Sequence, residues 1–243
     1  MHLSMEFKRS VQSRFIIPLA FLHAATVGLG YILLTALDKI SIVTEPLLAE
    51  SVYTVYTQFG VFFFAPIFIY SISGDYKDKN IIFYKTLGFN HVTYFLEKLL
   101  LILAYSLVGA CISSVLVCIP YNYFTVMPFF FLKVFAVMVF YTIVTLSLAF
   151  MLGKFLTVFF TVIILWIVGI LIAQITLPMH YFAYYDATAP DYKLFISFLR
   201  EKEATQNILS TIMNNYIFDS VLLIASVLVI SLSKKRWVKQ GIY

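Results

Sequence analysis

Long apolar segments alternate with short polar ones along this sequence, and this alternation restricts the fold more than any other feature. Six segments are long enough to cross a bilayer, which takes about 20 residues in a helix: 15–37, 52–73, 99–119, 129–152, 155–177 and 216–233. Only 12% of the residues are charged, about half the share in a soluble domain. We therefore predict an all-α integral membrane protein, with one transmembrane domain of six transmembrane helices over residues 1–243.

The positions of Lys and Arg predict how these helices are oriented, because basic residues concentrate on the cytoplasmic side of a membrane. With the N-terminus inside, twelve of the 17 basic residues lie on the inner side: Lys8, Arg9, Arg14, Lys77, Lys79, Lys85, Lys98, Lys154, Lys234, Lys235, Arg236 and Lys239. We expect a multi-pass protein of the cytoplasmic membrane, with both termini and segment 74–98 in the cytoplasm and segment 178–215 outside. The net charge of +5 follows from this orientation, so no nucleic-acid partner is expected.

Two shorter segments have a different character from the apolar ones. Residues 1–14 are basic on one side and apolar on another, which predicts an interfacial helix on the inner membrane surface. Segment 74–98 carries clustered charges, among them Asp75, Asp78 and Lys85, and apolar residues at helical spacing before Gly88 and Asn90. Such a helix either docks a soluble partner or only anchors the loop to the membrane surface, and the pattern allows both.

Motifs for chemistry are missing from the sequence. It has no GxxxxGK[ST] loop for ATP, no GxSxG nucleophile and no HExxH metal motif, so we expect a chain that is not an enzyme and holds no cofactor or metal. A gradient-driven carrier is expected to carry ionisable residues at membrane depth, and the apolar segments are almost free of them. We interpret Asp219, at the beginning of the sixth segment, as an interfacial or capping carboxylate.

This layout resembles the permease subunits of ABC-2 type exporters. The shared features are six spans with both ends inside, a basic N-terminal helix and a charged helix between spans two and three. Asp75 or Asp78 matches the acidic residue of the family's cytoplasmic loop, Tyr84-Lys85-Thr86-Leu87-Gly88 matches its middle, and Tyr94–Lys98 matches the run into span three. Phe89-Asn90-His91 stands where the family usually has a proline. The turn Leu152-Gly153-Lys154-Phe155 is similar to the family's second cytoplasmic contact.

The resemblance implies a partner: a separate P-loop ATPase subunit that binds ATP and magnesium. It also implies a second permease copy or paralogue, a short extracellular helical cap within 190–215 and a Gram-positive bacterial source. The cargo would be an amphipathic peptide, as in bacteriocin export and immunity, or a lipid-like molecule. The residues implied to couple to the ATPase are Asp75, Asp78, Tyr84, Lys85, Thr86, Leu87, Gly88, Phe89, Asn90, His91, Gly153 and Lys154.

Aromatic residues of the second apolar segment are candidates for a translocation or dimer interface: Phe59, Phe62, Phe63 and Tyr70. The alternative is that they face lipid. Two other functions stay open, namely an immunity or scaffold protein that works without ATP and a gradient-driven carrier.

Overall fold

The computed structural model describes residues 7–8, 10–11, 15–175, 181, 183–201 and 205–233, and every regular element in this part of the chain is helical. Six helices are long and apolar enough to cross a membrane, which confirms the predicted fold class. They are α2 (Ile16–Ile32, continued by the π-helical turn η1, Leu33–Leu37), α3 (Glu45–Lys77), α5 (His91–Cys118), α6 (Met127–Leu152), α7 (Phe155–Ala173) and α9 (Thr205–Leu232). Two short helices are α4 (Asn80–Thr86) and α8 (Pro190–Glu201).

Helix α3 is longer than its apolar segment. It begins at Glu45 rather than at Val52, since extended Thr44 precedes it and Pro46 lies in its first turn, where the missing N–H of proline breaks no helical hydrogen bond. Its 33 residues make it about 50 Å long, well beyond the ~30 Å of a hydrocarbon core. Pro66 lies inside the helix and removes one backbone hydrogen bond there.

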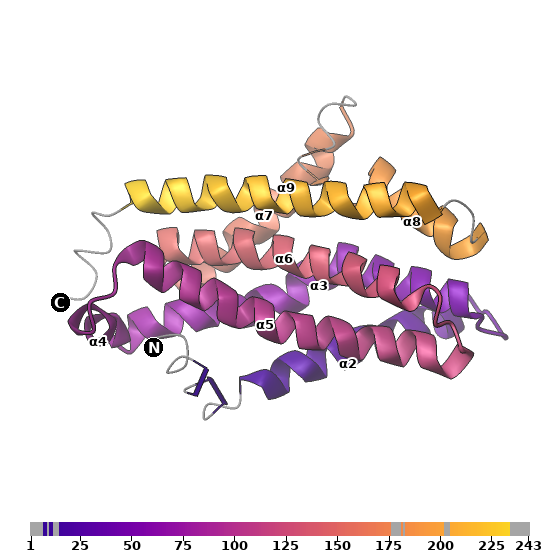
Figure 1. Cartoon of the computed structure of the whole chain (residues 1–243), viewed down its shortest axis with the longest axis horizontal. Coiled ribbons are helices and arrows are strands. Elements are labelled where there is room, and N and C mark those ends of the chain that lie inside the picture. The colour runs from indigo at the N-terminus through magenta and orange to yellow at the C-terminus, as the bar shows by residue number, and fades with distance from the viewer. Residues whose placement is uncertain are drawn as a thin grey trace.

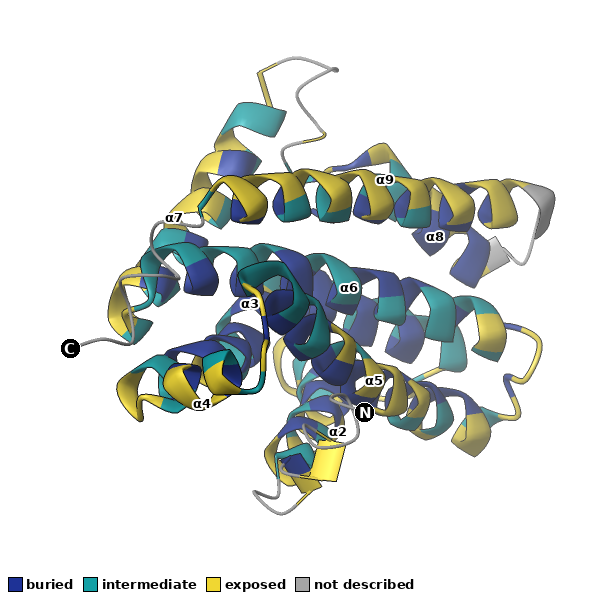
Figure 2. Ribbon diagram, turned by 60° about the vertical axis from the view of Figure 1, so that its left-hand side comes forward, coloured by how far each residue is buried: buried dark blue, intermediate teal, exposed yellow. Residues whose placement is uncertain are grey.

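Helix α6 occupies the centre of the bundle (Figure 1). It packs against α3, α5, α7 and α9, while α2 packs against α3 and α5. The spans of α3, α5 and α6 bury half or more of their residues, whereas α2, α7 and α9 bury less than a quarter. Figure 2 shows this difference as dark blue on the central helices and yellow on the outer side of α9. The outer helices therefore offer their remaining surface to lipid.

Small residues allow the central helices to approach one another closely. A Cβ added at Gly60 of α3 would lie 2.7 Å from Cε2 of Tyr141 in α6, and one added at Gly109 of α5 would lie 2.1 Å from Cδ2 of His23 in α2. Packing of this kind drives helix association in a bilayer, where lipid tails are as apolar as the side chains.

The two ends of the bundle carry different short elements (Figure 1). At one end, α4 connects the end of α3 to the start of α5, and His91 Nε2 of α5 is 3.3 Å from the carbonyl oxygen of Ser231 in α9. At the other end is α8, whose Leu199 carbonyl accepts a 2.8 Å hydrogen bond from Tyr123. The expected interfacial helix 1–14 and the basic residues from 234 onward lie largely outside the described residues, so the orientation of the chain stays a prediction.

Candidate functional site

The first candidate site is the short helix α4, held between the ends of two membrane helices. The chain leaves α3 through Asp78 and Lys79, and Lys79 adopts a left-handed conformation with φ 58°. After α4 the chain turns at Gly88, whose φ of 82° suits glycine. Asn90 then caps α5 by accepting a 2.7 Å hydrogen bond from the backbone N–H of Thr93. Short turns at both ends fix the position of α4.

A buried ion pair lies beneath α4. Lys98 Nζ of α5 is 2.8 Å from Asp75 Oδ2 of α3, and the two side chains are only 7% and 4% exposed. The Tyr94 hydroxyl donates to the same carboxylate oxygen at 3.0 Å, and the Asn80 amide of α4 donates to the other oxygen at 3.2 Å. Asp75 therefore links α3, α4 and α5 at a single carboxylate.

Tyr84 of α4 also contacts this buried ion pair. Its hydroxyl lies 3.3 Å from Lys98 Nζ, and the same nitrogen lies 5.4 Å from the centre of the Tyr84 ring. The ring also packs edge-on against Tyr94 and Phe89, with ring centres 5.0 and 5.4 Å away. Charge, hydrogen bonds and aromatic contacts converge here and fasten α4 to the ends of α3 and α5.

The opposite side of α4 faces away from the protein. We call it the α4 surface, and its exposed residues are Lys77, Asp78, Lys79, Ile82, Phe83, Thr86, Gly88 and Asn90. Phe83 is 59% exposed and Ile82 is 40% exposed, so two large apolar side chains stand among charged neighbours. Of the predicted coupling residues, Asp78, Thr86, Gly88 and Asn90 belong to this surface.

The other predicted coupling residues lie deeper or to one side. Asp75, Tyr84 and Phe89 are buried, and Lys85, Leu87 and His91 are partly exposed. The second predicted contact, Gly153 and Lys154, connects α6 to α7, with Gly153 at φ 72° and Lys154 exposed. It lies at the same end of the bundle as α4, because the ring of Phe150 in α6 contacts the rings of Tyr76, Tyr94 and Phe95.

Sequence reasoning missed three of the residues that define this site. It did not single out Ile82 and Phe83 as the exposed apolar pair, and it did not pair Lys98 with Asp75. A large apolar residue on the side of a short helix that faces away from the protein can be recognised in a sequence as a candidate for an exposed contact. The ion pair left no such signal, since its partners belong to different helices.

The second candidate site is a cavity of about 350 Å³ between α3, α6, α7, α9 and the segment around residues 183–186, which we call the α7 cavity. Both α7 and α9 pack on α6, but α7 crosses the direction of α6 and α9 instead of running alongside them (Figure 1). The walls are mostly apolar and include Val61, Val144, Val162, Leu165, Trp166 and Phe218.

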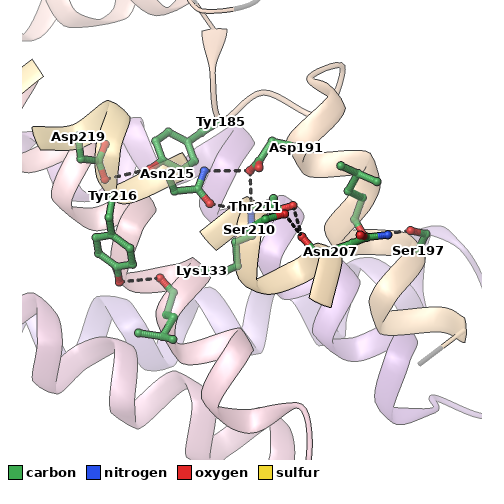
Figure 3. A network of polar contacts seen from close by, with 12 residues as sticks. Lys133, Tyr185, Asp191, Ser197, Asn207, Ser210, Thr211, Asn215, Tyr216 and Asp219 are labelled. Atoms are coloured by element: carbon green, nitrogen blue, oxygen red, sulfur yellow. Dashed lines mark hydrogen bonds and ion pairs between the residues drawn. The ribbon is translucent and has the colours of Figure 1, made fainter. Parts of the chain in front are cut away.

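Polar groups gather in and beside this cavity. Asp186 lines it and accepts hydrogen bonds from the Gln58 amide and from the backbone N–H and hydroxyl of Thr188. Tyr185 also lines it and donates a 3.0 Å hydrogen bond to Asp219 Oδ2 (Figure 3). Burial, together with the neighbouring Asp219, raises the pKa of Tyr185 well above its usual value, so its hydroxyl remains a donor.

Asp219 corrects the sequence interpretation. It was predicted to be an interfacial or capping carboxylate, but α9 begins at Thr205, so Asp219 lies within the helix and is 2% exposed. Its Oδ1 has no hydrogen-bond partner among the residues that the structure describes. The assumption that the spans are almost free of charge was therefore incomplete.

Lys133, counted in the sequence as one of the outer charges, is completely buried in α6. Its Nζ lies 2.6 Å from Asp191 Oδ2 of α8 and 2.7 Å from Asn215 Oδ1 of α9. Asn215 in turn donates to Asp191 at 2.9 Å, so the three side chains form a closed triangle (Figure 3). An exposed bidentate pair, Arg200 with Glu50, ties α8 to α3 as well. The helix α8 is thus fastened across the ends of three spans.

The aromatic residues of span two point in different directions. Phe62 is half-buried and packs edge-on against Trp166 of α7, with ring centres 5.5 Å apart. Phe63 is also half-buried, while Phe59 and Tyr70 are 44% and 63% exposed. In the part of the chain that the structure describes, no group of three or more His, Cys, Asp or Glu residues could hold a metal ion.

Comparison with known proteins gives two matches. A profile of the "Peptide export permease protein YydJ family" matches residues 3–242. A protein of Bacillus subtilis (strain 168), described as "Probable peptide export permease protein YydJ", is 26% identical over 246 residues that cover 99% of this chain and 100% of that protein. No solved structure matches. These matches agree with the resemblance to small ABC-2 type permeases.

Proposed function

Because the chain belongs to the YydJ family of peptide export permeases, we propose that it is the membrane-spanning subunit of an exporter of amphipathic peptides, driven by ATP that a separate subunit hydrolyses. Its role as a permease agrees with the family and with six membrane-spanning helices. In the proposal, the P-loop ATPase subunit holds ATP and magnesium and docks on the α4 surface, and Lys154 adds a second contact at the same end.

The observation that carries this proposal is the construction of α4. An exposed apolar pair, Ile82 and Phe83, is presented on a helix whose other side is bound to α3 and α5 through Asp75, Lys98 and Tyr84. A helix that only anchored a loop to lipid would need the apolar pair but not a buried ion pair beneath it. A helix that transmits force needs both.

The path of the force follows α3. Its cytoplasmic end carries Asp75, and the same helix lines the α7 cavity with Thr57 and Val61. Asp75 and Val61 are 14 residues apart, about 21 Å along a helix. Movement of α4 on ATP binding would therefore shift one wall of the cavity directly.

A second permease copy or paralogue completes the proposed exporter. Phe59, Phe63 and Tyr70 follow one another at intervals of four and seven residues, which places them on one side of α3. Phe59 and Tyr70 are the exposed members, so they are the better candidates for contact with a second protomer, whereas Phe62 is engaged by Trp166 within this chain.

Co-purification with the ATPase subunit tests the docking site. The chain and its ATPase are expressed together, and Phe83→Ser is compared with Ile42→Ser, which changes an even more exposed apolar residue (77% against 59%) between α2 and α3. We expect F83S to reduce both ATPase recovery and permease-dependent ATP hydrolysis by about tenfold or more, as for an apolar hot spot, and I42S to leave them unchanged. Undiminished binding and hydrolysis in F83S would show that α4 is not the docking site.

A gradient-driven carrier is the second candidate, favoured by the buried carboxylate of Asp219. Ionisable groups at membrane depth are typical of proton-coupled and sodium-coupled carriers. Transport in vesicles separates the two: export that continues without ATP, depends on a proton or sodium gradient and stops in Asp219→Asn would favour the carrier.

A further inference from the structure

The α7 cavity has mostly apolar walls and one carboxylate, Asp186, among its lining residues. Its volume of about 350 Å³ lies at the lower end of the range for ligand sites, about 300–1,000 Å³. It can therefore hold a few apolar side chains but not a whole peptide. Asp186 is the charged residue among those that line the cavity, and none of the lining residues is Lys or Arg.

The charge of Asp186 is not compensated by a cation within the part of the chain that the structure describes. The carboxylate is 6% exposed and accepts hydrogen bonds only from neutral donors, Gln58 and Thr188. A buried carboxylate normally has a positive partner. A ligand cation would supply it.

A second and independent observation also indicates a ligand. Thr145 lines the cavity and is 1% exposed, and within the described part of the chain its hydroxyl has no hydrogen-bond partner. Buried polar atoms in proteins are nearly always paired, and a threonine in a helix usually bonds to its own backbone, as Thr142 does to Met138. A hydroxyl left unpaired on the cavity wall is available to a polar group of an occupant.

We infer that the α7 cavity binds one end of a cationic amphipathic peptide, with apolar side chains between α6 and α7, an ammonium or guanidinium group at Asp186 and a peptide polar group at Thr145. The inference rests on the proposed function in taking the cargo to be a peptide. It goes further in naming the chemistry of that peptide. A phospholipid fits less well, because its phosphate would meet Asp186, with Asp219 close behind Tyr185.

Contact quenching of Trp166 tests the inference on the chain alone in phosphatidylcholine nanodiscs. The sequence contains two tryptophans, so Trp237→Phe leaves Trp166 as the only tryptophan, which is excited selectively over tyrosine. The probe is a short leucine–lysine peptide with a free amino terminus and a bromophenylalanine, which quenches tryptophan only on contact. The matched probe has all of its amino groups acetylated.

We expect saturable quenching by the cationic probe and binding weaker by about tenfold or more for the acetylated one, since a desolvated charge pair is lost. Asp186→Asn should weaken the cationic probe to the same degree. Val144→Phe should weaken both probes by filling the cavity, while Leu171→Phe, on the exposed side of α7 (62% exposed), should bind both as the parent does. The comparison of the two probes on the W237F parent needs no substitution in the cavity.

Three results would overturn the inference: equal binding of the two probes, unchanged binding in V144F, or quenching of Trp166 by brominated acyl chains that the cationic probe does not relieve. The last would make lipid the occupant. Because the assay contains no ATPase, the inference can fail while docking at α4 holds. Conversely, F83S should bind the probe normally even where it has lost the ATPase.

Discussion

Replacing Lys98 with Met should loosen the attachment of α4 to the membrane helices. The substitution keeps most of the side-chain volume but removes the ammonium group that lies 2.8 Å from the buried Asp75 carboxylate, which Tyr94 and Asn80 also contact through neutral donors. Both members of the pair are almost fully buried, so solvent does not screen the lost interaction. Removal of one partner from such a pair costs about 3–5 kcal/mol.

Hydrogen exchange of the α4 backbone measures this effect. The N–H groups of Ile82 and Leu87 bond to the carbonyl oxygens of Lys79 and Phe83 at 3.1 Å and exchange when α4 opens. A loss of 3–5 kcal/mol raises their exchange rates by about two to three and a half orders of magnitude. The double variant Asp75→Asn/Lys98→Met removes both charges of the pair and should recover to within about 1–2 kcal/mol of the parent.

Lys77→Met is the matched control, because Lys77 is exposed at the end of α3 and should change stability by less than about 0.5 kcal/mol. The reasoning is refuted if K98M exchanges no faster than K77M. It is also refuted if the double variant exchanges as fast as K98M, because the charge of Asp75 without Lys98 would then not be the cause.

Two further predictions concern the membrane helices and are checked by thermal unfolding in detergent. Lys133→Met should lower stability by about 3 kcal/mol, since Asp191 and Asn215 lose their buried cation. Arg200→Gln, in the exposed pair with Glu50, should cost less than about 1 kcal/mol. Equal losses of stability in the two variants would contradict this prediction. Gly109→Ala should cost about 1–3 kcal/mol, because the new methyl group meets the His23 ring, and Gly28→Ala, with nothing within 4 Å of the new atom, should not destabilise.

The fold could be predicted from the sequence because the length and apolarity of a membrane span are local properties. The residues at which the helices begin were harder to predict than the existence of the helices. The signal for the true start of α3, Thr44 followed by Glu45 and Pro46, is present in the sequence, but it lies outside the apolar segment that marks the span. Similarly, α9 begins at Thr205, eleven residues before the apolar run at 216, because polar residues continue the helix alongside α8.

The charged side chains were misjudged for a different reason. Asp75 meets Lys98, and Lys133 meets Asp191, only after helices far apart in the chain have packed together. The pattern of a single sequence shows neither the contact nor the burial. We therefore interpreted Lys133 as a charge that sets the membrane orientation and Asp219 as an interfacial or capping carboxylate. The α7 cavity was equally invisible, since it depends on the angle at which α7 leaves α6.

The position of Pro66 within α3 has a mechanical consequence. If the helix pivots there, the arm to Asp75 spans nine residues, about 14 Å, and the arm to Glu45 spans 21 residues, about 32 Å. Such a lever more than doubles any displacement applied at its short end, so a 1 Å push at α4 would move the far end by about 2 Å. Glu50, which pairs with Arg200 of α8, lies on that long arm, so a small displacement at α4 would be transmitted to α8 at the opposite end of the bundle.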